Sequence, residues 1–515
     1  MQRPLIAVLG LGMAALMSPD PCSAQVTVVN VVPALNSAET SNNPEANLAV
    51  KDASLKTLAV TAHLPGRGWC VNQTLNGLFA STDGGSTWTL VCAVLPQAPP
   101  TDKPGDFTTR FSGTGAWLYV SGLLPGGIPS LVASANVLSG TAYMNLLGTN
   151  PSIGNVDQPQ LRTARLPAYA TGIAEVDDGY TDTNGDSITD CYRGRFLGTT
   201  TLPPSISLES QCTALRVREE RPWATRIAVH DSGVTYVALL EVKTNDANVT
   251  HGDVVVLRGK PFDTSAPHAL HAIQESGTTT TNICDPSDGQ IGIRVVTCVP
   301  LAWDGSLNPN FGFEVRRGAL AIAVDPTNSQ TVYIAWADSA DVALMQTVHV
   351  RKSTNGGMTW PPTDLFAIPN ATNPSLAVDA SGRLGFLSQQ YVASRTNARW
   401  HTRLRVLPLV GDAQDILLAD TPAVDPAPDR TTPYQGDYTD VVAVGSTFLG
   451  VFAARNDPAE VVFPYGVTYN RYCSNGKLRK APSGSGVVKA SVDPFFFRVG
   501  PGPIGQTVPG TGLNC

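Results

Sequence analysis

The chain has 515 residues and a formal net charge of −7, and only 15% of its residues are charged while 42% are hydrophobic. This low charge, together with 47 glycines and 40 prolines, excludes a coiled coil and a charged disordered chain. A mildly acidic chain without basic runs also lacks what a binder of phosphate backbones needs, so nucleic acid is not an expected partner.

The first 24 residues have the pattern of a secretory signal peptide. Arg3 precedes an apolar stretch from Leu5 to Met17, and small residues near the end predict cleavage after Ala24. A lipid anchor at Cys22 is the alternative, but the prolines and the aspartate before it do not match a lipobox. No later stretch approaches the ~20 apolar residues of a membrane span. We expect an exported protein, secreted or periplasmic, with no transmembrane segment.

Eight cysteines remain after this cleavage, and an even number in an exported chain predicts disulfides. No two of them have the C-x-x-C spacing typical of metal sites. Pairing between sequence neighbours predicts four bridges: Cys70–Cys92, Cys191–Cys212, Cys284–Cys298 and Cys473–Cys515. The last bridge would return the final residue to the body of the protein.

A weak unit recurs along the chain: a polar or Pro/Gly-rich lead-in, a short apolar strand, a turn and a second apolar strand. The first strands of these units are predicted at residues 44–50, 105–111, 158–162, 221–229, 318–326, 373–378 and 436–444. Each contains one apolar anchor: Leu48, Phe111, Leu161, Ile227, Ile322, Leu376 or Val442. Short strands of this composition, without helical periodicity, predict an all-β fold.

Radial repetition of four-stranded sheets is one way in which an all-β chain avoids exposed edges. We therefore predict a six- or seven-bladed β-propeller, with seven preferred. Its blades would be four-stranded and antiparallel, with disulfide-bridged loop insertions.

Two eight-residue segments match each other: residues 81–88, Ser-Thr-Asp-Gly-Gly-Ser-Thr-Trp, and residues 353–360, Ser-Thr-Asn-Gly-Gly-Met-Thr-Trp. The shared positions are Ser81, Asp83, Gly85, Thr87 and Trp88 in the first segment, and Ser353, Asn355, Gly357, Thr359 and Trp360 in the second. An Asp or Asn side chain accepts backbone hydrogens within a tight turn, a glycine supplies positive φ, and the tryptophan packs the turn into the sheet. Both segments resemble the Asp-box, or BNR repeat, of the sialidase-like (neuraminidase) β-propellers.

The resemblance extends over roughly residues 40 to 475 and implies a domain organisation. Residues 1–24 would be the cleaved signal peptide, 25–475 the sialidase-like propeller, and 476–515 a Gly/Pro/Ser-rich tail that is returned by a disulfide. In the family, the boxes lie on turns between the third and fourth strands of a blade, away from the active site. The boxes are therefore expected to be scaffold.

A sialidase of this family binds the sugar carboxylate with three arginines and uses a tyrosine nucleophile, a glutamate and an acid/base aspartate. Its first arginine stands in an Arg-Ile-Pro motif ahead of the first box. This chain lacks the motif, and Arg67 is the only arginine between Ala24 and Ser81. It also has fewer boxes than the family usually has. We therefore expect a propeller without full sialidase chemistry.

Polar residues at the start of each innermost strand would face the central axis of a propeller. The candidate ligand-binding arginines are Arg110, Arg162, Arg221, Arg226 and Arg317. The candidate catalytic residues are Tyr434, Tyr438, Asp437, Asp106 and Glu220, and Asp440 belongs to the same axial set. Such a mixture suits a glycan; the alternative is that these residues satisfy hydrogen bonds between blades.

Residues 182–190, Asp-Thr-Asn-Gly-Asp-Ser-Ile-Thr-Asp, resemble a calcium-binding loop. A hard cation takes oxygen ligands from alternate positions of such a loop. The predicted ligands are Asp182, Asn184, Asp186, the backbone carbonyl of Ile188, and Asp190. Ser187 stands where glycine is usual and Arg193 where a bidentate glutamate would be, so an acidic turn is the alternative. We expect a structural calcium and no organic cofactor.

Two hypotheses about function follow. The first is an exported propeller that binds an extracellular glycan or a cell-surface protein at its central mouth. The second is a divergent glycoside hydrolase of exo-sialidase type, or a lyase, that acts on extracellular glycans. Whether the protein is an enzyme stays open at this point, as does its oligomeric state.

Overall fold

The computed structural model describes the regular core of the chain and leaves gaps between its parts. The described residues are 25–38, 40, 45–62, 74–94, 107–113, 115–124, 128–135, 138, 141–143, 145–149, 156–165, 174–182, 191–195, 222–232, 234–245, 250–259, 292–301, 319–339, 346–393, 398–408, 412–423, 435–436, 439–459, 461–482 and 486–501. Within them, every regular element is a β-strand except one turn of 3₁₀ helix, η1 (Ala34–Asn36). The all-β prediction is confirmed.

The first three sheets come from the N-terminal half of the chain, and each is named here after its innermost strand. The β2 sheet contains β2 (Asn47–Val50), β3 (Leu58–Thr61), β4 (Thr74–Ser81), β5 (Thr89–Val94) and, parallel to β5, β9 (Thr141–Tyr143). The β6 sheet contains β6 (Phe107–Phe111), β7 (Leu118–Leu124), β8 (Ile128–Ser134) and β10 (Asn145–Thr149). The β11 sheet contains β11 (Val156–Arg165), β12 (Ala174–Asp182) and β13 (Cys191–Arg195).

The next three sheets are antiparallel and follow the chain order. The β14 sheet contains β14 (Pro222–Val229), β15 (Thr235–Asn245), β16 (Thr250–Gly259) and β17 (Ile293–Leu301). The β18 sheet contains β18 (Leu320–Asp325), β19 (Asn328–Asp338), β20 (Thr347–Ser353) and β21 (Phe366–Ile368). The β22 sheet contains β22 (Ala371–Val378), β23 (Leu384–Val392), β24 (Arg399–Leu407) and β25 (Gln414–Pro422).

The last sheet, the β26 sheet, joins the two ends of the described chain. Its order is β26 (Asp440–Val444), β27 (Thr447–Arg455), β31 (Val492–Val499), β1 (Val26–Asn30) and β28 (Thr468–Tyr469). β1 pairs antiparallel with β31 and parallel with β28. A separate hairpin is formed by β29 (Cys473–Ser474) and β30 (Lys477–Leu478).

The position of β31 differs from the predicted tail at 476–515. This strand pairs along its length with β27 and β1, and Phe495, Phe496 and Phe497 are all buried. Three consecutive buried aromatics bury too much apolar surface for a solvated tail. Glycines and prolines on both sides of the strand conceal it in the sequence.

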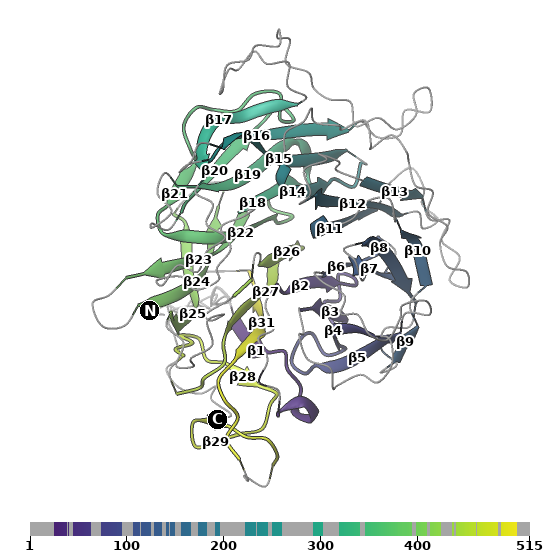
Figure 1. Ribbon diagram of the computed structural model, residues 1–515, viewed down its shortest axis with the longest axis vertical. Coiled ribbons are helices and arrows are strands. Elements are labelled where there is room, and N and C mark those ends of the chain that lie inside the picture. Colours follow the sequence, from purple (N-terminus) through teal and green to yellow (C-terminus); the bar gives the residue numbers. More distant parts are fainter. Residues whose placement is uncertain are drawn as a thin grey trace, which may run out of the picture.

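The innermost strands surround one centre. In cyclic order β2, β6, β11, β14, β18, β22 and β26 each contact the next, and β26 contacts β2 again. Figure 1 shows the sheets extending outward from this centre. The seven predicted anchor residues all lie on these strands. A radial arrangement of antiparallel sheets is the architecture of a β-propeller.

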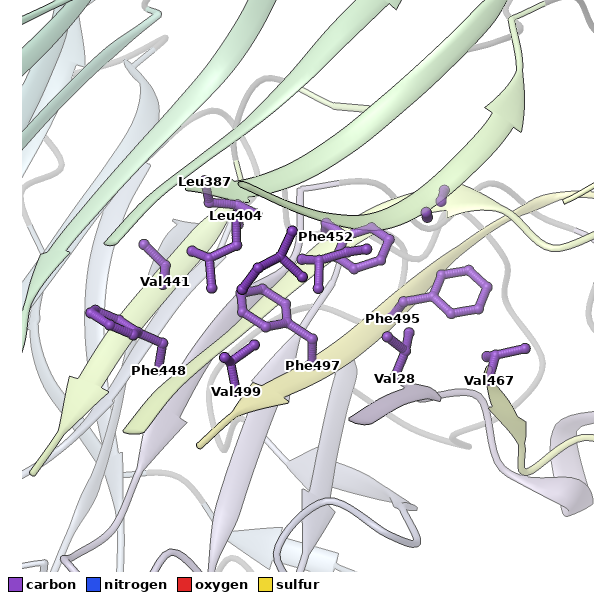
Figure 2. Close-up of a cluster of buried hydrophobic side chains, with 14 of the residues drawn as sticks. Val28, Leu387, Leu404, Val441, Phe448, Phe452, Val467, Phe495, Phe497 and Val499 are labelled. Atoms are coloured by element: carbon purple, nitrogen blue, oxygen red, sulfur yellow. The ribbon is translucent and has the colours of Figure 1, made fainter. Parts of the chain in front are cut away.

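The hydrophobic core lies between neighbouring sheets. In Figure 2, Phe448 and Phe452 of β27 and Phe497 of β31 face Leu387 and Leu404 of the β22 sheet. All five side chains are buried, and each contributes roughly 1.5–3 kcal/mol by leaving water. This packing between neighbouring sheets helps to hold the ring together.

Two other predictions, the four disulfides and the absence of a transmembrane segment, concern residues of which only part are described. Cys92, Cys298 and Cys473 are disulfide-bonded, but the predicted pairing involves Cys70, Cys191, Cys212, Cys284 and Cys515, whose side chains lie outside the described residues. The pairing therefore stays a prediction. In the described segments, no helix has the length and apolar character that crossing a membrane requires.

Candidate functional site

A small pocket lies where the innermost strands converge. It is lined by Asn47, Gln160, Arg162, Arg226, Leu320, Ala321, Ile322, Pro374, Ser375, Leu376, Thr439 and Asp440. These residues come from β2, β11, β14, β18 and β22 and from the start of β26. The space for water-sized occupants is about 20 Å³. A cavity of that size accepts a water molecule or the oxygens of a carboxylate group, but not a sugar ring.

The carboxylate of Asp440 organises one side of this pocket. Arg110 donates from Nη2 to Asp440 Oδ1 at 3.1 Å, and its Nη1 lies 3.0 Å from Oδ2. The backbone N–H of Leu48 donates to the same Oδ2 at 2.9 Å. The side chains of Arg110 and Asp440 are only 9% and 2% exposed. Because a buried carboxylate needs several such partners, this pair ties β6 and β2 to β26.

The other hydrogen bonds of Arg110 all come from Nη1 and end on residues of β2 and β6. Nη1 donates to the backbone carbonyls of Leu48 at 2.8 Å and Thr109 at 2.6 Å, and to the side-chain oxygen of Asn47. Arg110 is therefore a structural cation behind the pocket. This arrangement matches the alternative noted above, in which axial polar residues satisfy bonds between blades.

Arg162 has a different environment. Its Nη1 donates to the carbonyl of Leu161 at 2.8 Å, and its Nη2 lies 3.9 Å from Asp440 Oδ1. The side chain is 25% exposed and lines the pocket. Burial and the nearby guanidiniums of Arg110 and Arg226 lower the pKa of Arg162 to about 9, against the opposite effect of Asp440. Arg162 stays protonated at neutral pH, and a bound anion would relieve the repulsion around it.

The described part of the site thus contains three guanidiniums and one carboxylate. Arg110, Arg162 and Arg226 come from the adjacent strands β6, β11 and β14, and Asp440 begins β26. Asp440 is the only acidic residue among the described residues that line the pocket. The remaining polar lining, from Asn47, Gln160, Ser375 and Thr439, is neutral.

A buried amide network supports the pocket from the β22 side. Asn373 has a φ of 52°, which is unusual for a residue other than glycine. Its Nδ2 donates to Gln389 Oε1 and to the carbonyl of Gly436, both at 2.8 Å, and its carbonyl accepts from Thr439 Oγ1 at 2.9 Å. Gln389 also donates to Gln435 and to the carbonyl of Ala453. The network holds the backbone on both sides of the pocket-lining residues.

Sequence reasoning named part of this site and missed the rest. The structure brings Arg110, Arg162, Arg226 and Asp440 together. Seven other candidates lie outside the described residues: Tyr434, Tyr438, Asp437, Asp106, Glu220, Arg221 and Arg317. Neutral residues of the site were not named at all: Asn47, Gln160, Asn373 and Gln389. Only Asn373, an asparagine before a proline inside an apolar strand, carries a local signal.

The first of the two matching segments, residues 81–88, forms the turn from β4 to β5, the third and fourth strands of its sheet. Ser81 Oγ donates to Asp83 Oδ1 at 2.8 Å and accepts from Gly85 N at 2.9 Å. Thr87 donates to Asp83 from both its backbone N–H (2.9 Å) and its hydroxyl (2.6 Å), and Trp88 Nε1 donates to the Gly85 carbonyl. Burial raises the pKa of Asp83, but these hydrogen bonds outweigh it and lower the pKa overall.

The second segment forms the equivalent turn from β20 to β21. Gly357 N donates to Ser353 Oγ at 3.0 Å and Thr359 N to Asn355 Oδ1 at 3.0 Å. Here Asn355 Nδ2 donates to Thr359 Oγ1 at 2.8 Å, so the side-chain bond runs in the opposite direction. In both turns the side-chain hydrogen bonds stay within the turn, as expected of a scaffold element. No residue of 81–88 or 353–360 is among the described residues that line the axial pocket.

A second titratable cluster lies away from the axis, where the β14 and β18 sheets meet. His349 contacts Asp364 at 2.6 Å through Nδ1 and Asp338 at 3.2 Å through Nε2. Burial alone would lower the pKa of His349, but the two carboxylates outweigh it and raise the pKa. Arg351 bonds both Asp364 and the carbonyl of Val295 on β17. The cluster therefore fastens one sheet to the next.

The predicted calcium loop lies almost entirely outside the described residues. Asp182 is the last residue of β12, and Asn184, Asp186, Ile188 and Asp190 are not described. Elsewhere in the described chain, no group of three or more His, Cys, Asp or Glu side chains is placed to hold a metal ion.

No protein-family model matches this chain, and neither does any curated protein. Solved structures do match it. An α-L-arabinanase of Penicillium chrysogenum complexed with arabinobiose shares 10% identity over 75% of this chain and 92% of that chain, with a TM-score of 0.34. An ulvan lyase from a new family of polysaccharide lyases shares 9% identity over 81% and 92%, with a TM-score of 0.41. The α-L-arabinofuranosidase of Fusarium graminearum with arabinobiose shares 9% over 66% and 92%, with a TM-score of 0.27. Since these scores lie below 0.5, fold and function rest on the chain's own residues.

Proposed function

We propose that the protein is an exported, seven-bladed β-propeller of the sialidase-like, BNR-containing type that binds an acidic glycan at the mouth of its axial pocket. The seven sheets around one centre support the blade count. The hydrogen-bonded turns at residues 81–88 and 353–360 support the relationship to the sialidase-like, BNR-containing propellers. The observation that carries the function is Arg162, a cation that lines the axial pocket and is partly open to water.

The pocket chemistry favours a carboxylate as the group recognised. An arginine binds a carboxylate through paired N–H donors, and Arg162 has donors beyond the one that Leu161 occupies. Gln160 and Ser375 add polar side chains to the same lining. Because the pocket is too small for a sugar ring, the ring would lie outside it, in the mouth.

Binding without turnover is the better supported of the two functional hypotheses. The sialidase scheme needs its arginines available to the substrate, whereas Arg110 is committed to Asp440 and to two backbone carbonyls. The alternative, a divergent glycoside hydrolase or lyase, is favoured by the convergence of three arginines from adjacent strands. Tyr434, Tyr438, Asp437, Asp106 and Glu220 would then be the residues to test.

Calorimetric titration tests the proposal. The purified chain should bind 3′-sialyllactose or digalacturonate and should not bind neutral lactose. The variant Arg162→Met should bind about tenfold more weakly or worse, since a hydrogen bond to a charged group contributes about 1.5–3 kcal/mol.

Arg405→Met is the matched control, because it removes the same charge from β24, the third strand of the β22 sheet, away from the axial pocket. It should bind the acidic sugars like the wild type. Equal affinity of Arg162→Met and the wild type, or equal binding of lactose, would contradict the proposal. Turnover of a fluorogenic sialoside that is lost in Tyr434→Phe or Tyr438→Phe would favour the enzyme.

Three further expectations are part of the proposal. Residues 1–24 would be a cleaved signal peptide, the eight mature cysteines would form the four predicted disulfides, and Asp182, Asn184, Asp186, Ile188 and Asp190 would bind a structural calcium. Mass spectrometry of the exported chain before and after reduction tests the first two. Addition of calcium should raise the Tm, and Asp186→Asn should abolish that increase.

A further inference from the structure

A hairpin near the C-terminus concentrates positive charge in an otherwise acidic chain. Residues 473–491 contain no acidic residue and four cations: Lys477, Arg479, Lys480 and Lys489. The three lysines are exposed and the arginine is half-buried. Within the part of the chain that the structure describes, none of the four forms an ion pair with a carboxylate.

The arginines of the propeller body behave differently. Among the described residues, ten of them pair with an aspartate: Arg110, Arg162, Arg294, Arg351, Arg383, Arg399, Arg403, Arg405, Arg455 and Arg471. The four cations of the hairpin therefore lack, in the described chain, the ion pairs that these arginines form. An uncompensated cationic surface attracts polyanions over distances of about a Debye length.

Backbone hydrogen bonds and two buried side chains anchor the described residues that carry these cations. Leu478 and Val488 are buried in the core of the β26 sheet, and Val488 N donates to the Leu478 carbonyl at 3.0 Å. Lys480 N donates to the Gly486 carbonyl at 3.1 Å, and Cys473 is disulfide-bonded. A pre-organised surface loses less entropy when it binds than a flexible basic tail does.

We propose that the cations of this basic hairpin, carried by the described residues 473–482 and 486–491, form an electrostatic docking surface for a sulfated or carboxylated polysaccharide. It is separate from the axial pocket: β29 lies at the lower end of Figure 1, away from the centre where the innermost strands meet. A membrane surface fits less well, because membrane-bound surfaces insert aromatic or leucine side chains. Val487 is the one large exposed apolar residue among the described residues of this hairpin.

Salt elution of the full chain from immobilised dextran sulfate tests the proposal. The double variant Lys477→Gln/Lys480→Gln should elute at lower NaCl than the wild type. The slope of log affinity against log salt should fall by about one for each lysine removed. The matched control Lys51→Gln/Lys56→Gln makes the same charge change on the turn between β2 and β3, and should elute like the wild type.

Four results would overturn the proposal. The first is equal retention of the wild type and Lys477→Gln/Lys480→Gln. The second is tighter binding, at the same salt, to phosphatidylglycerol vesicles or to duplex DNA than to dextran sulfate. The third is weaker binding of 3′-sialyllactose by the hairpin variant, which would show that the hairpin and the axial pocket belong to one site. The fourth is loss of retention in Arg162→Met. Because the sialyllactose titration reports on the axial pocket alone, the failure of either proposal can be recognised independently.

Discussion

The first Asp-box turn and the axial pocket are both polar, but they are built in opposite ways. In the turn, the side-chain hydrogen bonds join residues within 81–88, and the two carboxylate oxygens of Asp83 bond residues no more than four positions away. In the pocket, Asp440 bonds Arg110 and Leu48, which lie 330 and 392 positions away in the sequence. The comparison teaches that a short motif can specify its own geometry, while the pocket exists only after the ring of sheets has closed.

The largest expected effect on the free energy of unfolding is that of a substitution at the axis. Asp440→Ala would leave the buried guanidinium of Arg110 without its carboxylate, and removing one partner of a buried ion pair costs about 3–5 kcal/mol. Urea unfolding should show this loss. The double variant Arg110→Met/Asp440→Leu should recover part of it, because it removes the orphaned charge. A loss below about 1 kcal/mol for Asp440→Ala would mean that the axis does not depend on this pair.

An intermediate effect is expected where the turn meets the core. Gly85 has a φ of +90°, and an added Cβ would lie 2.3 Å from a ring carbon of Phe496 on β31. Gly85→Ala should therefore cost about 2–4 kcal/mol from backbone strain and overpacking. The control is Gly445→Ala, at φ +58° with nothing within 4 Å, which should cost only about 1 kcal/mol. Similar melting temperatures for the two variants would show that the turn does not pack as described.

The smallest effect is expected inside the turn itself. Asp83→Asn should cost less than about 1 kcal/mol at pH 7, because the second turn keeps its bonds with Asn355 when the side-chain bond to Thr359 is reversed. The pKa of Asp83 is lowered in the folded state, so its contribution is present above the unfolded pKa of about 4 and is lost as the pH falls. Thermal unfolding between pH 7 and pH 3 should therefore be slightly less acid-sensitive in Asp83→Asn. The same dependence of the melting temperature on pH in Asp83→Asn and in the wild type would contradict a lowered pKa of Asp83 in the folded state.

Strand prediction succeeded because it depended on local composition. Each of the seven anchors, from Leu48 to Val442, is an apolar residue in a short run bounded by turn-forming residues, and each lies on an innermost strand. It failed for β31, where Phe495 to Phe497 lie between glycine- and proline-rich stretches. The partners of that strand, β1 and β27, are distant in the sequence, so no local pattern indicates them.

The sequence by itself determined the all-β class, the places of the innermost strands and the two box turns, since these depend on residues within about ten positions of one another. It also named the arginines that approach the axis. Only the tertiary structure decided that Arg110 is committed to Asp440 while Arg162 is partly open to water, and that β1 and β31 close the last sheet. The physical reason is that charge compensation and strand pairing are set by neighbours in space, and in a ring those neighbours come from opposite ends of the chain.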